Sequence, residues 1–157
     1  MGGHFRHTKW DPFLIISQIV CLQALYYLGL GIWLILMNFI TGDLLSSDTV
    51  FNYQVLNLSE GHGRIISTAY VLNALFSALA LWWVVQRTKL CLDFSCTTLL
   101  YHVLLCWAVS GRWPASATWW LVQLVCLGLA CVGGEFLCMR TELAAIPVGL
   151  GGGRVDL

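Results

Sequence analysis

The chain has 157 residues and a formal net charge of zero, with 59% hydrophobic and only 10% charged residues. Soluble domains contain about 45–50% apolar and about 25% charged residues, so the composition excludes an ordinary soluble domain. Nucleic acid is not expected as a partner, because the sequence has neither a net positive charge nor a long basic run. The composition predicts an all-α, polytopic membrane protein whose main partner is the lipid bilayer.

The N-terminal segment, residues 1–12, is polar and partly basic and ends in a helix start. Asp11 is suited to cap the free N–H groups of a first turn, and Pro12 is tolerated at the first helical position. Trp10 suits the headgroup layer. A first span is predicted from residue 13 to about residue 40. It exceeds the roughly 20 residues that a bilayer needs, so we expect it to tilt or project.

Three further apolar stretches follow, and they predict spans at about residues 65–85, 94–109 and 118–138. The polar loop 41–64 contains an apolar patch, Val50-Phe51 and Val55-Leu56, which we expect to rest on the membrane surface. The spans form one domain, residues 1–147. Residues 148–157 are rich in glycine, which predicts a flexible tail.

An even number of spans places both termini on one side of the membrane. That side carries six of the eight basic residues, namely Arg6, Lys9, Arg87, Lys89, Arg140 and Arg154. The other side holds only Arg64 and Arg112. The positive-inside rule therefore predicts that both termini are cytosolic.

Glu135 is a carboxylate inside the fourth apolar stretch, about one turn before its predicted cytosolic exit. Such groups are costly in hydrocarbon and often mark function. Two interpretations stay open. In a local role, Glu135 reaches the interface, pairs with Arg140 or is protonated; in a functional role, it acts within the membrane. A metal site with Cys131 and Cys138 is not favoured, because no histidine shares that helix face.

Other polar side chains fall within the predicted spans, namely Gln18, Gln23, Asn73, His102 and Gln123. They are expected to form hydrogen bonds between helices, and a proton relay is the alternative. Small residues at helical spacing, Ala74 with Ala78 and Ala130 with Gly134, indicate close helix approach.

The seven cysteines are absent from both far-side loops, which excludes an exported disulfide framework. Cys91 and Cys138 lie at the predicted cytosolic boundary, where either S-palmitoylation or simple packing is expected. No phosphate-binding loop, nucleophile elbow or metal-spaced histidine pair is present. We therefore expect no enzyme activity and no cofactor.

Several segments resemble the SYS family of Golgi integral membrane trafficking proteins over residues 5–147. They are Trp10-Asp11-Pro12, Ser17-Gln18-Ile19-Val20, Asn73-Ala74-Leu75, Cys91-Leu92-Asp93-Phe94, Thr118-Trp119-Trp120-Leu121-Val122-Gln123 and the stretch from Gly134 to Leu143. The last is the most specific of them, whereas the first far-side loop and the glycine-rich tail match poorly.

The resemblance implies a four-span protein of the Golgi, mainly of its trans side. It also implies a membrane receptor for an Arf-related small GTPase with an acetylated N-terminus, which in turn directs a second Arf-like GTPase and tethering golgins. The cytosolic surface expected to bind this partner comprises Trp10, Asp11, Arg87, Lys89, Asp93, Arg140 and Glu142. Glu135 is expected just beneath it.

Two alternatives belong to other classes of function. A small proton-coupled transporter or intramembrane enzyme would use Glu135, His102 and Asn73, and requires a polar cavity that connects them. A lipid-binding structural protein is the third hypothesis.

Overall fold

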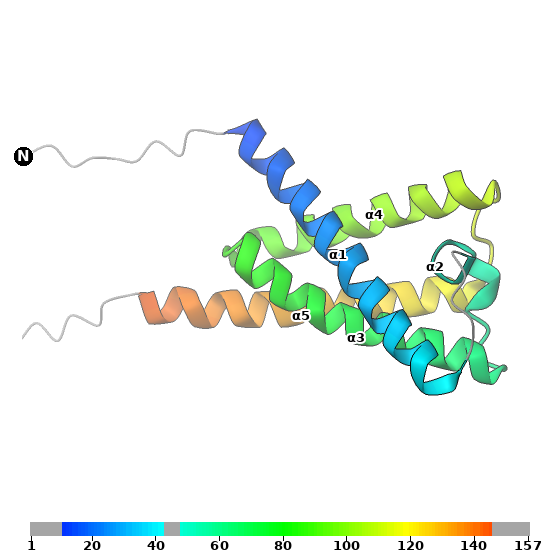
Figure 1. Cartoon of the computed structure of the whole chain (residues 1–157). Helices are drawn as coiled ribbons and strands as arrows, with labels where there is room; N and C mark the ends of the chain where they lie inside the picture. Colours follow the sequence, from blue (N-terminus) through cyan, green and yellow to red (C-terminus); the bar gives the residue numbers. More distant parts are fainter. Residues whose placement is uncertain (1–10, 43–47, 146–157) are drawn as a thin grey trace, which may run out of the picture.

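The computed structural model describes residues 11–42 and 48–145, and within these ranges it is helical, without β-strands. Trp10 and the predicted tail 148–157 lie outside the described residues. Figure 1 shows the long helices α1 (Pro12–Thr41), α3 (Gly61–Val84), α4 (Cys91–Ser110) and α5 (Ala117–Ala145), with the short elements α2 (Asp48–Phe51), η1 (Tyr53–Val55) and η2 (Thr88–Leu90). Within the described residues, four helical segments are long and apolar enough to cross a membrane, which confirms the predicted all-α fold with four spans.

The helix ends follow from local chemistry. The carboxylate of Asp11 accepts a hydrogen bond from the backbone N–H of Phe13 at 3.2 Å, and proline occupies the first helical position. Helix α1 ends at Gly42, whose φ of 75° suits glycine. Helix α5 continues to Ala145, beyond the predicted end of the span at residue 138, because no helix-breaking residue follows until Pro147.

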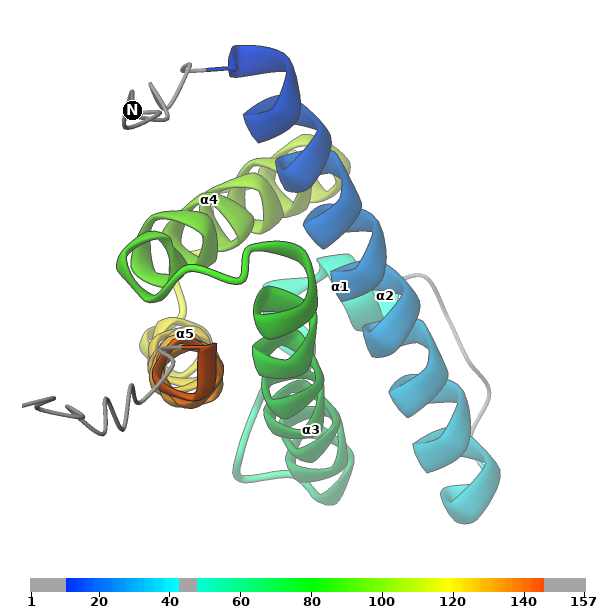
Figure 2. The ribbon, with the colours of Figure 1, turned by 90° about the vertical axis from the view of Figure 1, so that its left-hand side faces the viewer.

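Helix α3 lies between α1 and α5, while α4 packs chiefly on α5 (Figure 2). The contact between α3 and α5 is close because small residues face each other. A β-carbon at Gly133 would lie 2.9 Å from the β-carbon of Ala78, and one at Gly134 would lie 3.2 Å from that of Leu81. Small residues therefore allow close helix approach, as the spacing predicted.

The described ends of the chain, Asp11 and Ala145, lie at the same end of the bundle, on the left of Figure 1. The link 85–90 between α3 and α4 lies there too. We call this end the terminal end. The opposite end carries the segment 48–60 and the turn 111–116.

The segment 48–60 packs into the opposite end of the bundle. Leu56 is 1% exposed and belongs to a core cluster with residues of α1, α3, α4 and α5, while Val50, Phe51 and Val55 pack against that cluster. The hydroxyl of Tyr70 in α3 donates a hydrogen bond to the carbonyl of Val50 at 2.9 Å. The prediction that these apolar residues rest on the membrane surface is therefore wrong, because they bury their side chains against the helices.

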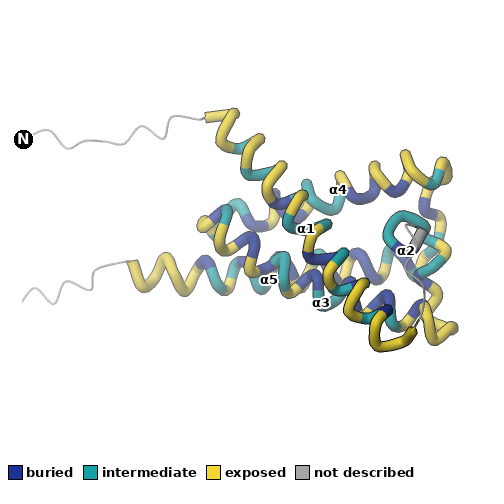
Figure 3. The backbone as a smooth tube through the Cα atoms, in the orientation of Figure 1, coloured by how far each residue is buried: buried dark blue, intermediate teal, exposed yellow. Residues whose placement is uncertain are grey.

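The outer faces of the long helices are apolar. Figure 3 shows exposed residues along much of α1. Its exposed large side chains are Phe13, Leu14, Ile16, Val20, Leu28, Ile32, Ile35, Leu36, Phe39 and Ile40. Such a continuous apolar surface is unstable in water and fits the hydrocarbon core of a bilayer.

Two glycines of α1 allow a matched test of the α1–α3 contact. A β-carbon at Gly29 would lie 2.5 Å from Oδ1 of Asn73 and from a ring carbon of Phe76, whereas one at Gly31 would meet nothing within 4 Å. We predict that Gly29→Ala destabilises the protein by about 1–3 kcal/mol through overpacking. Gly31→Ala should be neutral or stabilise it by up to about 1 kcal/mol, because alanine favours a helix.

Thermal unfolding of both variants in lipid nanodiscs measures the difference. Equal unfolding temperatures for the two variants would contradict the described packing of α1 on α3.

Candidate functional site

At the terminal end, Glu142 of α5 binds the link between α3 and α4. Its Oε1 accepts a hydrogen bond from the backbone N–H of Thr88 at 3.1 Å, and its Oε2 accepts one from the hydroxyl of Thr88 at 2.9 Å. The first N–H groups of a helix have no partner within that helix, and here the N-cap residue, Arg87, makes no side-chain cap for η2. A carboxylate from a distant helix therefore supplies the cap.

A second contact joins the same part of α5 to the end of α3. The indole N–H of Trp82 donates a hydrogen bond to the hydroxyl oxygen of Thr141 at 2.6 Å, and that hydroxyl donates to the carbonyl of Leu137 at 3.1 Å. Two consecutive residues of α5 thus hold both sides of the α3–α4 connection. We call the set Trp82, Thr88, Thr141 and Glu142 the terminal clamp.

Below the terminal clamp, Cys91 at the start of α4 faces Cys138 of α5. Their sulfur atoms are 3.7 Å apart, and neither residue is exposed. A β-carbon at Gly134 would lie 3.6 Å from the sulfur of Cys91, so α5 approaches α4 closely here. The two candidate acylation sites therefore point into the bundle and pack on each other.

Exposed charged residues surround the terminal clamp. Arg87 and Lys89 flank Thr88 in the link, and both attract the carboxylate of Glu142. Asp93 is exposed in the first turn of α4. The guanidinium of Arg140 lies 5.3 Å from the centre of the Phe136 ring, at the distance of a cation–π contact.

The structure thus brings Arg87, Lys89 and Glu142 together and places Arg140 and Asp93 on the adjoining helices. Asp11, in contrast, caps the start of α1, which diverges from the end of α5 in Figures 1 and 2.

Glu135 is half-buried, and its side chain contacts the preceding turn of α5. Its Oε1 lies 3.5 Å from the sulfur of Cys131, which donates to it. Among the described residues, Glu135 forms no ion pair with Arg140, which contacts Phe136 instead. These contacts are local to one helix.

His102 is fully buried at the centre of an aromatic cluster. Its Nδ1 lies 3.0 Å from the hydroxyl of Tyr27, and its Nε2 lies 3.6 Å from the sulfur of Cys106. The ring stacks on Trp119 with centroids 6.1 Å apart and an interplanar angle of 17°. His102 therefore joins α1, α4 and α5 by packing and hydrogen bonding, as expected for an interhelical contact.

Two amide side chains also join helices. Nδ2 of Asn73 in α3 donates to the carbonyl of Tyr26 in α1 at 3.1 Å, and Nε2 of Gln18 in α1 donates to the carbonyl of Val84 in α3 at 3.1 Å. Gln23 is half-buried in α1.

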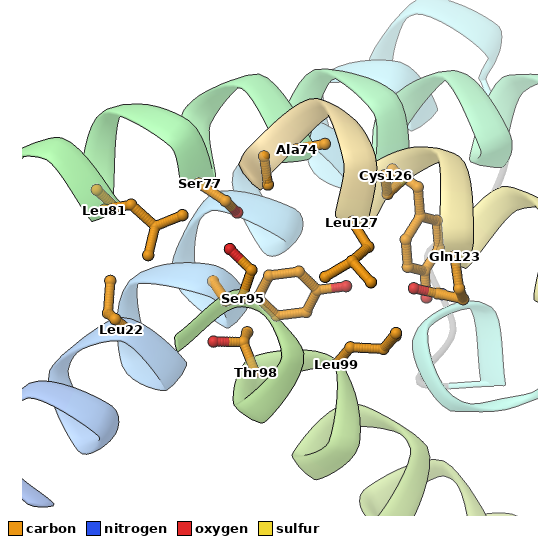
Figure 4. Close-up of a pocket in the computed structure, with 14 residues that line it drawn as sticks. Leu22, Ala74, Ser77, Leu81, Ser95, Thr98, Leu99, Gln123, Cys126 and Leu127 are labelled. Atoms are coloured by element: carbon orange, nitrogen blue, oxygen red, sulfur yellow. The ribbon is translucent and has the colours of Figure 1, made fainter. Parts of the chain in front are cut away.

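A central cavity of about 50 Å³ lies between the four long helices (Figure 4). Gln123 lines it, but Glu135, His102 and Asn73 do not. The cavity therefore does not connect the three residues that a transporter or intramembrane enzyme would use, and no observation favours that alternative.

The sequence does not predict a functional or network role for Thr88, Thr141, Trp82 or Tyr27. Their partners lie 54 to 75 residues away along the chain. No local pattern predicts such pairs. Of the four residues, only Trp82 stands out in the sequence, because it lies at the end of a span. The preference of tryptophan for membrane interfaces already explains that position, so it does not indicate a hydrogen bond.

Four membrane-spanning helices, an apolar outer surface and a small polar terminal end define a polytopic integral membrane protein. A family model described as "Integral membrane protein S linking to the trans Golgi network", SYS1, matches residues 5–148. The chain belongs to this SYS1 family, as the resemblance predicted.

Proteins from three organisms are similar to the chain. It is 44% identical to the Protein SYS1 homolog of Nematostella vectensis over 96% of each chain. Identity to the Protein SYS1 homolog of Dictyostelium discoideum is 40%, over 92% of this chain and 62% of the relative. Identity to Protein SYS1 of Saccharomyces cerevisiae is 25%, over 77% of this chain and 60% of the relative. No solved structure matches the chain.

The protein is accordingly a multi-pass membrane protein linked to the trans-Golgi network, and its family is one of membrane trafficking proteins rather than a known enzyme family.

The terminal clamp predicts a local change in backbone protection. Replacing Glu142 by alanine removes the acceptor of the Thr88 N–H, so hydrogen exchange at Thr88 should become faster while exchange in the core of α3 stays unchanged. Hydrogen–deuterium exchange of peptides that cover the link measures this.

Arg140→Ala is the matched control, because it removes a charge from the same turn of α5, and no hydrogen bond joins Arg140 to the link in the described part of the chain. Equal acceleration in both variants would contradict the role given to the hydrogen bonds of Glu142.

Proposed function

We propose that the protein is a Golgi membrane receptor that recruits an Arf-related small GTPase, with an acetylated N-terminus, to the trans-Golgi network. The observation that carries the proposal is the terminal clamp, in which Glu142 fixes both the backbone and the hydroxyl of Thr88. It holds a short polar surface in one conformation at the end of a membrane bundle.

This function requires the terminal end to face the cytosol. The distribution of basic residues supports that orientation, because Arg87, Lys89 and Arg140 lie at the terminal end, whereas Arg64 and Arg112 lie at the opposite end. The family description, which links these proteins to the trans-Golgi network, supports the organelle.

The small size of the polar surface at the terminal end limits the kind of partner segment that it can bind. The link 85–90 and the last turns of α5 are too small to form an independent domain. They suffice to hold a short amphipathic segment or a modified N-terminus of a partner. An amphipathic segment binds a membrane only weakly and reversibly on its own. A receptor adds a second contact and raises the effective concentration at one organelle.

A fixed link also favours binding, because a surface that is already ordered loses less conformational entropy when a partner docks. The exposed Arg87 and Lys89 lie near the carboxylate of Glu142 and attract it. That carboxylate already accepts two hydrogen bonds from Thr88, so the surface offers the positive charge of Arg87 and Lys89 to a partner. Such a surface would select partly acidic contacts on the partner.

Charge reversal tests the surface. We expect the triple variant Arg87→Glu, Lys89→Glu, Arg140→Glu to lower recovery of the GTP-locked GTPase from solubilised membranes by about tenfold or more, because opposing charges at an interface discriminate strongly. Comparison with the GDP-locked form establishes whether recruitment depends on the nucleotide.

The matched control reverses Arg64 and Arg112, which are exposed at the opposite end of the bundle. It should leave recovery unchanged. Both variants must reach the Golgi, which microscopy of the tagged protein checks. Recovery that is unchanged in the triple variant, or lost equally in the control, would contradict the proposal.

A further inference from the structure

The central cavity lies among side chains of all four long helices, between the aromatic cluster around His102 and the terminal end. Figure 4 shows Ser77 and Leu81 from α3, Ser95 and Thr98 from α4, and Gln123 from α5 around it. The lining is mostly apolar, but it includes the polar side chains of Tyr26, Tyr70, Ser77, Ser95, Thr98 and Gln123.

Three of these groups are hydroxyls whose protons are already used. The hydroxyls of Ser77, Ser95 and Thr98 each donate to the backbone carbonyl four residues earlier, at 2.8, 2.7 and 2.9 Å. Each oxygen keeps lone pairs with which it accepts further hydrogen bonds. The cavity therefore presents acceptors from α3 and α4.

The cavity also has a hydrogen-bond donor from α5. Gln123 is 2% exposed and lines the cavity, and its Nε2 has no hydrogen-bond partner among the described residues. A buried amide without a partner is strongly unfavourable, so such groups are normally satisfied by protein or by ordered water. An occupant that accepts a hydrogen bond would satisfy the amide of Gln123.

The volume decides between the possible occupants. The cavity measures about 50 Å³, and one water needs about 10–15 Å³ of such space, which leaves room for roughly three to five waters. A cavity that binds a benzene ring is about 150 Å³, so the smaller volume here favours waters over an aromatic ligand. A lipid acyl chain offers neither a donor nor an acceptor, and it would leave Gln123 unsatisfied.

We propose that the central cavity is a binding site for a small cluster of ordered water molecules. The cluster accepts a hydrogen bond from Nε2 of Gln123 and donates to the hydroxyl oxygens of Ser77, Ser95 and Thr98. It joins α5 to α3 and α4 at a level of the bundle where α3 and α4 make few direct contacts with each other. This inference is independent of the partner proposed above.

A crystal structure of the full chain grown in a lipidic mesophase, with and without xenon pressure, tests the proposal. Polar cavities that hold water exclude xenon, whereas dry apolar cavities bind it. We expect discrete water peaks within hydrogen-bond distance of Nε2 of Gln123 and no xenon. Continuous acyl-chain density in the cavity, or a xenon peak there, would overturn the proposal.

A pair of variants tests whether the amide of Gln123 binds the water cluster. Gln123→Met removes the donor and should abolish the water peak nearest to residue 123. Leu124→Met is the control, because Leu124 is next to Gln123 in the sequence but is exposed on the outer face of α5. The water peaks of this variant should match those of the unmodified protein. Unchanged water in the Gln123 variant would overturn the role given to the amide. Should that variant not fold, the xenon measurement on the unmodified chain still decides.

Discussion

The hydrocarbon core of a bilayer offers no hydrogen-bond partners, and this constraint determines how the chain arranges its polar groups. The long helices place large apolar side chains outward and polar side chains inward, as Tyr27 and His102 or Gln18 and the carbonyl of Val84 illustrate. Each of these two contacts joins residues of different helices, 75 and 66 residues apart in the sequence. Because the outer surface gains little from helix association in lipid, these inward contacts and the close approach at Gly133 fix the arrangement.

At the terminal end, polar contacts join α5 to the end of α3 and to the link that follows it. Glu142 and Thr141 extend α5 beyond the apolar stretch, and there they bind Thr88 and Trp82. The same carboxylate therefore caps η2 and holds the link that carries Arg87. One short segment of α5 thus joins the link between α3 and α4 to the rest of the bundle.

Hydropathy and charge alone predicted the fold class, because four apolar stretches long enough to span a bilayer are compatible with few folds other than a helical membrane bundle. Sequence selected Glu142 as a surface residue but could not indicate its partner, since Thr88 lies 54 residues away. The segment ending at Leu56 was misjudged because its apolar residues fit a membrane surface and a bundle core equally well by composition. The position of Gln123 beside a cavity likewise depends on packing among four helices, which no local pattern encodes.

We propose that the terminal end is the surface to which the GTPase binds. Site-specific photo-crosslinking in cells tests it most directly, with the crosslinking amino acid placed at position 87 in the link or, separately, at position 112 at the opposite end. Both positions are exposed, so the two probes are comparable. Crosslinking of the GTPase from position 87 and not from position 112 is the predicted result. Crosslinking from position 112 alone, or none from position 87 while the GTPase is at the Golgi, would contradict the account.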